Sequence, residues 1–490
     1  MSAGVLGRTL ASLAVAAFLV GCPVGPNYQR PEILTPPTYR GAIDPAEAAS
    51  LADLPWWKVF SDPVLQGLID EAIRSNYDLR TAVARVEQAQ ALVGVVRAPF
   101  FPQVGYQGNA SRQRQFISPE FGSTTFNLFS GAFNLAWEID VWGRIRRATE
   151  AAQAELLATE EFRRGVLLSL VSSVAQAYFE LLELDSELAI AKATVVSFTE
   201  TLQLFERRYQ GGVGSKLQTD RAGAALYETE ATVPSLEAQI VAKENQINVL
   251  LGRNPDTILR GALLIDQVAP PEVPAGLPSE LLVRRPDLRE AEDTIVSANA
   301  QVGVAVANFF PRIGLTSLYG GESLELKDVV KSSANIWNVV GSVAGPIFTG
   351  GQLIEQYRAQ VAAWEQAKTQ WAQSVISAFS EVSSALVLQQ KLAEVRDAQE
   401  KTVRAYEGSV RLSLLRYNTG LANYYEVLEA QQLLFPAQLD LTRTQRDQLI
   451  IVVQLYRALG GGWELPTERW TAGGGEVVPA VQPASTGTDR

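Results

Sequence analysis

The residue types that usually carry enzymatic chemistry are scarce in this chain. Its 490 residues include no histidine, which removes the commonest general base and zinc ligand, and both the Ser-His and Cys-His nucleophile pairs. The glycine-rich stretch QGGVGS from Gln210 joins two predicted helices, whereas a phosphate-binding loop follows a strand. Carboxylates are numerous, but no predicted cleft places two of them as a glycosidase requires. These residue types therefore favour neither a His-dependent catalytic site nor a phosphate-binding loop nor a glycosidase site.

The single cysteine, Cys22, is the one side chain with a predicted covalent modification. It follows Arg8 and the apolar run LASLAVAAFLV from Leu10, a pattern typical of a secretory signal. An ordinary signal with a chance cysteine is the alternative. The ending LVGC resembles a bacterial lipobox, which implies cleavage before Cys22 and a lipid on its thiol. The residue after Cys22 is Pro23 and not Asp, which by the rule for such lipoproteins implies sorting to the outer membrane. No later apolar run approaches the ~18 residues of a membrane helix, so any further crossing would use β-strands.

Composition excludes one class of partner. The chain has 42 Lys and Arg against 53 Asp and Glu, a net charge of −11, and nucleic-acid binding needs clustered basic residues. The hydrophobic share of 47% is ample for a large ordered protein.

The chain is a tandem duplication. The nonapeptide APFFPQVGY from Ala98 returns as ANFFPRIGL from Ala307, and LFERRYQGGVG from Leu204 returns as LSLLRYNTGLA from Leu412. Further echoes end at Gly252 and Gly460, and all offsets are 207–209 residues. A unit of about 200 residues is far longer than a solenoid repeat of about 20–50.

Each unit contains one very long predicted helix. In the first unit the apolar residues step by three and four, as in a coiled coil: Leu167, Leu170, Val174, Ala177, Leu181, Leu184, Leu188, Ala191, Val195, Phe198, Leu202, Phe205 and Tyr209. The second unit keeps this register at Val375, Ala378, Val382, Ala385, Leu392, Val403, Tyr406 and Val410 and breaks it at Gln389, Arg396, Gln399 and Ser413. The long helices end at glycine turns, Gly211–Gly214 and Gly420. Return helices then run to Gly252 and Gly460.

The apolar period changes to two before each long helix. FNLAWEIDV from Phe133 sends alternate residues to one side, and the segment from Trp337 to Val343 does the same. Another candidate strand starts near Gln103 in the first unit and near Arg312 in the second, directly after the FFP corner, where a helix ends. A soluble β-subdomain is the alternative to a membrane sheet. Four strands cannot close a membrane barrel of eight or more, so two, three or four chains would have to combine.

The whole mature chain resembles the TolC-type outer-membrane efflux proteins, in particular their lipoprotein (NodT-like) branch. The similar stretches are GCPVGPNYQRPE from Gly21, WWKVFSDPVL from Trp56, RRPDLREAE from Arg284, FFPRIGL from Phe309, GPIFTGG from Gly345 and LYRALGGGW from Leu455. The resemblance implies a mainly α fold with a β-barrel portion. A trimer would complete a 12-stranded barrel and an α-helical tunnel in the periplasm of a Gram-negative bacterium. It also implies a periplasmic adaptor and an inner-membrane pump as partners, and a passive exit duct for small molecules. The family has no catalytic residues and no cofactor, so the resemblance implies none in this chain.

The expected organisation follows from the repeats and the resemblance. We expect a signal peptide over residues 1–21, a lipid-anchored extended segment over 22–60, a first repeat over 61–262, a Pro-rich linker over 263–279, a second repeat over 280–465 and a flexible tail over 466–490. A trimeric coiled-coil lipoprotein with a spacer or adhesive role is the alternative function, and a lipid-anchored hydrolase is a third. The alternating strands favour the duct, since a spacer does not need them.

The resemblance also assigns candidate site residues at the two helix turns. It implies that the adaptor-facing tip comprises Gly212, Val213, Gly214, Ser215, Gly420, Leu421 and Ala422; plain helix caps are the alternative. Glu426 and Glu429 share one helix face and match acidic pore-constriction residues, although carboxylates early in a helix also stabilise its dipole. Tyr417 matches a residue that latches the helices shut. The family's latch Arg is replaced by Ala422 and its acidic partner falls at Gln218, with Asp220 nearby, so a weaker latch or one using Arg416 is expected.

Overall fold

The computed structural model describes residues 23–41, 62–119, 122–267 and 278–461. These residues fall into two compact units. The strand unit comprises Met1–Ile33, Ala84–Glu161 and Asp287–Ser374, and the hairpin unit comprises Leu34–Val83, Phe162–Pro286 and Val375–Arg490, each in its described part. Each unit therefore takes segments from both sequence repeats.

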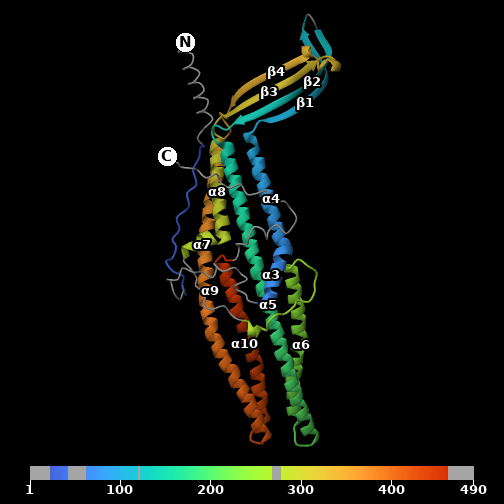
Figure 1. Ribbon diagram of the computed structural model, residues 1–490, viewed down its shortest axis with the longest axis vertical. Coiled ribbons are helices and arrows are strands. Elements are labelled where there is room, and N and C mark those ends of the chain that lie inside the picture. Colours follow the sequence, from blue (N-terminus) through green and yellow to red (C-terminus); the bar gives the residue numbers. More distant parts are fainter. Residues whose placement is uncertain (1–22, 42–61, 120–121, 268–277, 462–490) are drawn as a thin grey trace. The chain divides into compact units, whose positions relative to one another are not determined.

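The strand unit contains a four-stranded antiparallel sheet. Its strands are β1 (Gln103–Ser118), β2 (Gly122–Ile139), β3 (Arg312–Ser323) and β4 (Asn335–Ala344), in the order β1-β2-β3-β4 (Figure 1). The predicted strands are thus confirmed, and β2 runs further toward its N-terminus than its alternating apolar pattern. β1 and β4 are the edge strands, and among the described residues each has one row of backbone groups without a strand partner.

Both FFP corners lie where a helix passes into a strand. α4 (Tyr77–Arg97) is followed by a short 3-10 turn, Ala98–Phe100, before β1 begins, while α8 (Pro286–Ala307) is followed by Phe309 and Phe310 before β3 begins. Proline has no N–H to donate to a helix and holds the preceding residue extended. The repeated corner is explained by this change of backbone conformation.

The helices have the predicted lengths and turns. α5 (Arg144–Gln210) and α9 (Gln352–Asn418) are the two long helices, and α6 (Lys216–Leu250) and α10 (Tyr424–Ala458) are the return helices. α3 (Pro63–Ser75) and α7 (Pro278–Arg284) are shorter. Both return helices continue through a proline, Pro234 or Pro436, which costs each one helical hydrogen bond.

The predicted heptad seam forms the core of the hairpin unit. Leu167, Val174, Leu181 and Phe205 are almost fully buried, although Tyr209 at the end of the seam is exposed. Ser413 breaks the apolar register of α9 but is buried nonetheless. Partly buried ion pairs also join the repeats, with Arg446 of α10 2.7 Å from Glu183 of α5. Burial raises the pKa of Glu183 to about 7, opposed by Arg446.

The sequence predicts no apolar run of membrane length after the signal peptide. This prediction is wrong for α5. Among the described residues, this helix contains one 18-residue window that is long and apolar enough to cross a membrane. Yet 67% of that window is buried inside the chain. Its apolar residues are the seam of a coiled coil, which packs against neighbouring helices.

Candidate gate and docking tip

The two helix turns of the hairpin unit have the same backbone geometry. Gly212 and Gly420 have φ angles of +75° and +76°, which side chains other than glycine's rarely adopt. The following N–H of Val213 donates to the Arg208 carbonyl at 3.0 Å, and that of Leu421 donates to the Arg416 carbonyl at 2.8 Å. These bonds close the ends of α5 and α9 in the same way. The two turns therefore share their backbone conformation as well as their sequence pattern.

Each turn presents one apolar side chain to solvent. Val213 and Leu421 follow the left-handed glycines, and both are 72% exposed. Gly214 lies against the backbone of Arg208 and Tyr209, and Ser215 caps α6. The two turns therefore expose apolar residues at matching positions.

Gln218 and Asp220 are the residues expected at the position of the acidic latch partner. Both side chains contact residues within the first turn of α6. Gln218 and Ser215 form a reciprocal capping box, in which the Gln218 side chain accepts from the Ser215 N–H at 3.2 Å. Asp220 lies 2.7 Å from Lys216, four residues earlier in the same helix. Both side chains thus have local partners that account for their positions.

Tyr417 instead receives a hydrogen bond from a residue that the sequence analysis missed. Arg208 of α5 donates to the Tyr417 hydroxyl at 2.5 Å, and its guanidinium lies 5.0 Å from the centre of the Tyr417 ring. The contact joins the hairpin of the first repeat to that of the second. A signal was available: each repeat has an Arg-Tyr pair at this point, Arg208-Tyr209 and Arg416-Tyr417.

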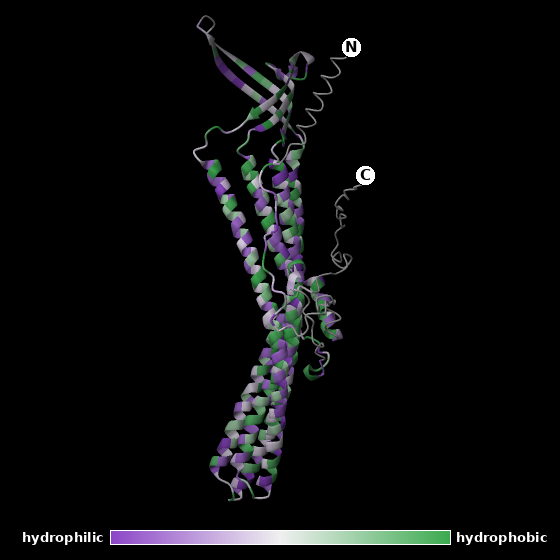
Figure 2. Cartoon of the chain, turned by 90° about the vertical axis from the view of Figure 1, so that its left-hand side faces the viewer, coloured by the Kyte–Doolittle hydropathy of each residue, from purple (hydrophilic) through white to green (hydrophobic). Residues whose placement is uncertain are grey.

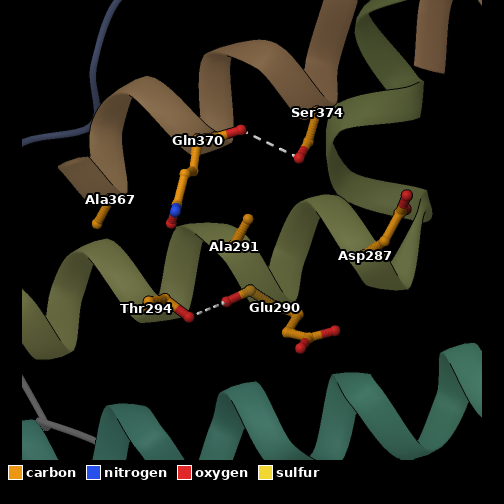
Figure 3. A pocket seen from close by; sticks show the side chains of 7 residues that line it. All are labelled: Asp287, Glu290, Ala291, Thr294, Ala367, Gln370 and Ser374. Carbon is orange, nitrogen blue, oxygen red and sulfur yellow. Dashed lines mark hydrogen bonds between the residues drawn. The ribbon is translucent and has the colours of Figure 1, made fainter. Parts of the chain in front are cut away.

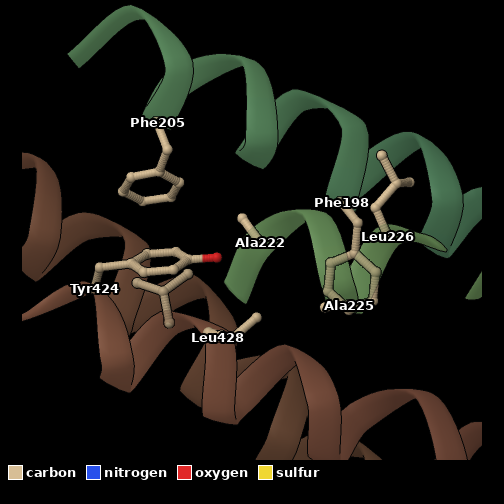
Figure 4. Close-up of a cluster of buried hydrophobic side chains, with 8 residues drawn as sticks. Phe198, Phe205, Ala222, Ala225, Leu226, Tyr424 and Leu428 are labelled. Carbon is tan, nitrogen blue, oxygen red and sulfur yellow. The ribbon is translucent and has the colours of Figure 1, made fainter. Parts of the chain in front are cut away.

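An aromatic cluster lies next to this contact. Phe205 and Tyr424 pack with ring centroids 3.8 Å apart, and each lies 5.9 Å from the Tyr417 ring. The buried cluster also includes Phe198 of α5, Ala222, Ala225 and Leu226 of α6, and Val427 and Leu428 of α10 (Figure 4). Burial raises the pKa of the Tyr424 phenol above its usual range. All four hairpin helices therefore meet at the level of the Arg208–Tyr417 contact.

Glu426 and Glu429, the residues expected to act as pore carboxylates, lie on α10 just beyond the second turn. Glu426 is 3.6 Å from Arg416, and both side chains are about half exposed. Arg416 also donates to the Leu421 carbonyl at 3.3 Å, so it closes its own turn and does not bridge the two hairpins. Glu429 is exposed one turn further along α10. A surface pair of this kind contributes about 0–1 kcal/mol, and the Glu426 side chain remains partly exposed to solvent.

One face of the sheet carries a row of aromatic side chains. Tyr106, Phe133, Tyr319 and Trp337 are successive cross-strand partners on β1, β2, β3 and β4. Directly paired residues point to the same face of a sheet, and these four are 60–86% exposed. The neighbouring pairs on that face include Val104, Leu135 and Val339. Figure 2 shows hydrophobic and hydrophilic residues intermixed along the strands, and the aromatic row gives one face of the sheet the apolar character that lipid contact requires.

Comparison with known proteins identifies the family. The sequence model of the outer membrane efflux protein family matches residues 68–253 and 277–461, which is most of the chain. The chain belongs to the outer membrane efflux protein family.

Relatives across this family cover nearly the whole chain. The chain is 34% identical over 465 residues to the solvent efflux pump outer membrane protein SrpC of Pseudomonas putida, covering 93% of this chain and 98% of the relative. It is 30% identical over 459 residues to the cation efflux system protein CusC of Escherichia coli O6:H1, with 93% and 99% covered.

Solved structures of the efflux protein family share the fold. The outer-membrane channel OprN matches with a TM-score of 0.84 and 30% identity, covering 90% of this chain and 100% of that one. The open state of the MtrE channel of Neisseria gonorrhoeae matches with a TM-score of 0.82 and 29% identity, with 90% and 99% covered. The predicted fold class, four strands and long helices of a trimeric barrel and tunnel, is confirmed.

Family membership decides between the functional alternatives. The relatives are outer membrane efflux proteins of tripartite systems, which supports the duct and neither the spacer nor the hydrolase. The family needs no cofactor, and its members form trimers in the outer membrane. The described residues contain no group of three or more side chains suited to a metal ion. The expected lipid-bearing Cys22 lies outside the described residues.

Proposed function

We propose that three copies of this chain form a passive exit duct, which receives small molecules from a periplasmic adaptor and an inner-membrane pump. The observation that carries the proposal is the aromatic row across all four strands. Because β1 and β4 both have open edges, such a sheet can lie in a membrane only after further copies pair with those edges. Repeating the row around a closed barrel would give the aromatic girdle typical of outer-membrane proteins.

The matching turns at Gly212 and Gly420 are proposed to be the adaptor-docking tip. Three chains supply six such turns, each with an exposed apolar residue and an open approach. Gly212, Val213, Gly214, Ser215, Gly420, Leu421 and Ala422 would make the contacts. The aromatic cluster and the Arg208–Tyr417 contact lie directly behind these turns and would hold the hairpins together when no partner is bound.

Ion conduction tests the duct and its carboxylates together. Purified trimers in a planar bilayer are expected to conduct without any energy source. Changing Glu426→Gln and Glu429→Gln together is expected to lower cation preference and block by divalent cations, since rings of carboxylates select cations. Trimer stability should change little because both side chains are exposed or half exposed. Unchanged selectivity and block would make these residues partners of the α10 helix dipole only.

Anchoring by Cys22 is proposed to assist the barrel without being required for insertion. The residues that follow Cys22 form hydrogen bonds with residues near the start of α5. The Val24 N–H donates to the Trp142 carbonyl at 3.1 Å, and Arg147 donates to the Asn27 side chain at 2.6 Å. We expect Cys22→Ser behind an ordinary signal peptide to lose the lipid, measured by mass spectrometry, yet to reach the outer membrane as trimers. Recovery of this variant as a soluble periplasmic protein would contradict the proposal.

A further inference from the structure

α8 occupies an internal position in the strand unit. It leads into β3, and β3 is paired on one side with β2 and on the other with β4. The sheet edges belong to β1, which α4 precedes, and to β4, which α9 follows. A second copy that pairs with an edge strand therefore adjoins α4 or α9. Any face of α8 that its own chain leaves open must point to the inside or the outside of the assembled wall.

The N-terminal segment covers one face of α8. Gly25 approaches Gly303 so closely that a Cβ on Gly25 would lie 2.6 Å from the Gly303 Cα. One end of this face is held by Glu292, which accepts hydrogen bonds from Tyr28 at 3.0 Å and from Arg30 at 2.8 Å. Asn299 lies between them on the helix and is fully buried. This face is closed by residues 23–30.

The opposite face of α8 carries an open polar stripe. The exposed residues of the helix are Asp287, Thr294 and Gln301, spaced seven apart, and we call them the α8 stripe. Thr294 is two residues from Glu292, which corresponds to about 200° around a helix. The stripe therefore points away from the N-terminal segment.

A groove between α8 and α9 runs beside this stripe. It has a volume of about 320 Å³ and is lined by Asp287, Glu290, Ala291 and Thr294 of α8 and by Ala367, Gln370 and Ser374 of α9 (Figure 3). The hydroxyls of Thr294 and Ser374 donate to carbonyls of their own helices, at 2.9 and 3.1 Å. The Gln370 amide points into the groove, whereas the Glu290 carboxyl is directed away from α9. The lining is small and polar.

The N-terminal segment indicates which face of α8 lies on the outer side of the assembled wall. In the proposed function, Cys22 carries a lipid, and this lipid enters the membrane that surrounds the barrel. Pro23 to Gly25 directly follow it and pack against Gly143, Arg147 and Gly303, so their face of α8 is the outer one. We propose that the α8 stripe and its groove line the interior of the duct.

This placement predicts the chemistry that a passing solute meets. The interior wall at α8 offers carboxylate, hydroxyl and amide groups, and the described groove contains no large apolar side chain. Burial, together with the nearby Asp287, raises the pKa of Glu290 to about 7. Asp287 contributes a carboxyl group to the lining of the groove. Its repetition in three copies favours cationic and polar solutes over anions at this level of the duct.

Thiol labelling with reagents of two sizes tests the orientation. Thr294→Cys is made in the Cys22→Ser background, which removes the only other thiol. A small charged methanethiosulfonate is expected to label Cys at position 294 in intact trimers, whereas a maleimide on a polymer too wide for the duct is not. Gln29→Cys is the matched control, because Gln29 is exposed on the N-terminal segment and should react with both reagents. Gln301→Cys repeats the test if Thr294→Cys trimers do not form.

The outcomes separate this inference from the proposed function. Labelling at position 294 by the polymer reagent, or by neither reagent, would overturn the interior placement. Small-reagent labelling is further expected to lower the bilayer conductance of Thr294→Cys trimers but not of Gln29→Cys trimers; an equal loss in both would also overturn it. Failure of the unmodified parent to conduct would instead refute the duct itself, while the labelling pattern would still report the orientation of α8.

Discussion

Replacing Gly212 or Gly420 by tryptophan is expected to abolish export while leaving trimers intact. A Cβ added at either glycine meets no atom within 4 Å, so the new side chain would project from the turn into the proposed docking surface. The positive φ angles cost any other L-residue about 1–2 kcal/mol. This cost falls on an exposed turn and should leave the buried cluster behind it intact. The effect should therefore fall on the partner contact.

Export is measured as the accumulation in cells of a fluorescent dye that the parent protein exports. Trimer formation is measured by electrophoresis of unheated membrane samples. Gly212→Asn controls for backbone strain, because asparagine tolerates the left-handed conformation better than other residues. Gly122→Trp controls for a bulky residue elsewhere: it also has positive φ and open space, but lies at the start of β2 in the β1–β2 hairpin. Undiminished dye export from both the Gly212→Trp and the Gly420→Trp variants would remove these turns from the docking surface.

Arg208→Ala is expected to give the largest change in gating. The Arg208–Tyr417 contact combines a charged hydrogen bond, worth about 1.5–3 kcal/mol when formed, with a cation–π interaction of about 0.5–2 kcal/mol. It is a side-chain hydrogen bond between α5 of one hairpin and α9 of the other, close to the two turns. Losing about 2 kcal/mol shifts a closed-to-open balance by roughly 30-fold per copy. Single-channel recordings should show a strong rise in open time.

Two further variants assign the cause of this change. Tyr417→Phe removes the hydroxyl that accepts from Arg208 but keeps the ring that packs near Phe205 and Tyr424, so an intermediate rise in open time is expected. Arg416→Ala is the matched control from the other repeat, because Arg416 contacts Glu426 and its own turn. If Arg416→Ala opened the channel and Arg208→Ala did not, the latch would lie within the second hairpin.

The local elements of this protein could be predicted because their signals are periodic along the chain. Leu167, Val174 and Leu181 mark a coiled-coil seam by spacing alone, since residues seven apart lie on one side of a helix. Phe133 and Trp137 mark one face of a strand for the corresponding reason. Glycine in the left-handed conformation ends a helix wherever it occurs, so Gly212 and Gly420 could be placed at turns.

The partners of these elements depended on tertiary structure. The sequence contains two equivalent Arg-Tyr pairs, and only the packing of the two hairpins about Phe205 and Tyr424 brings Arg208, rather than Arg416, to Tyr417. The alternation in each strand could not reveal that Tyr106, Phe133, Tyr319 and Trp337 form one row, because the register between strands sets which residues are opposite. Sequence alone also could not show which face of α8 is open, because the other face is covered by residues 23–30, which are distant in sequence. Periodicity along one chain segment fixes its own faces, whereas the rotation and register of one segment against another are set by contacts between residues distant in sequence.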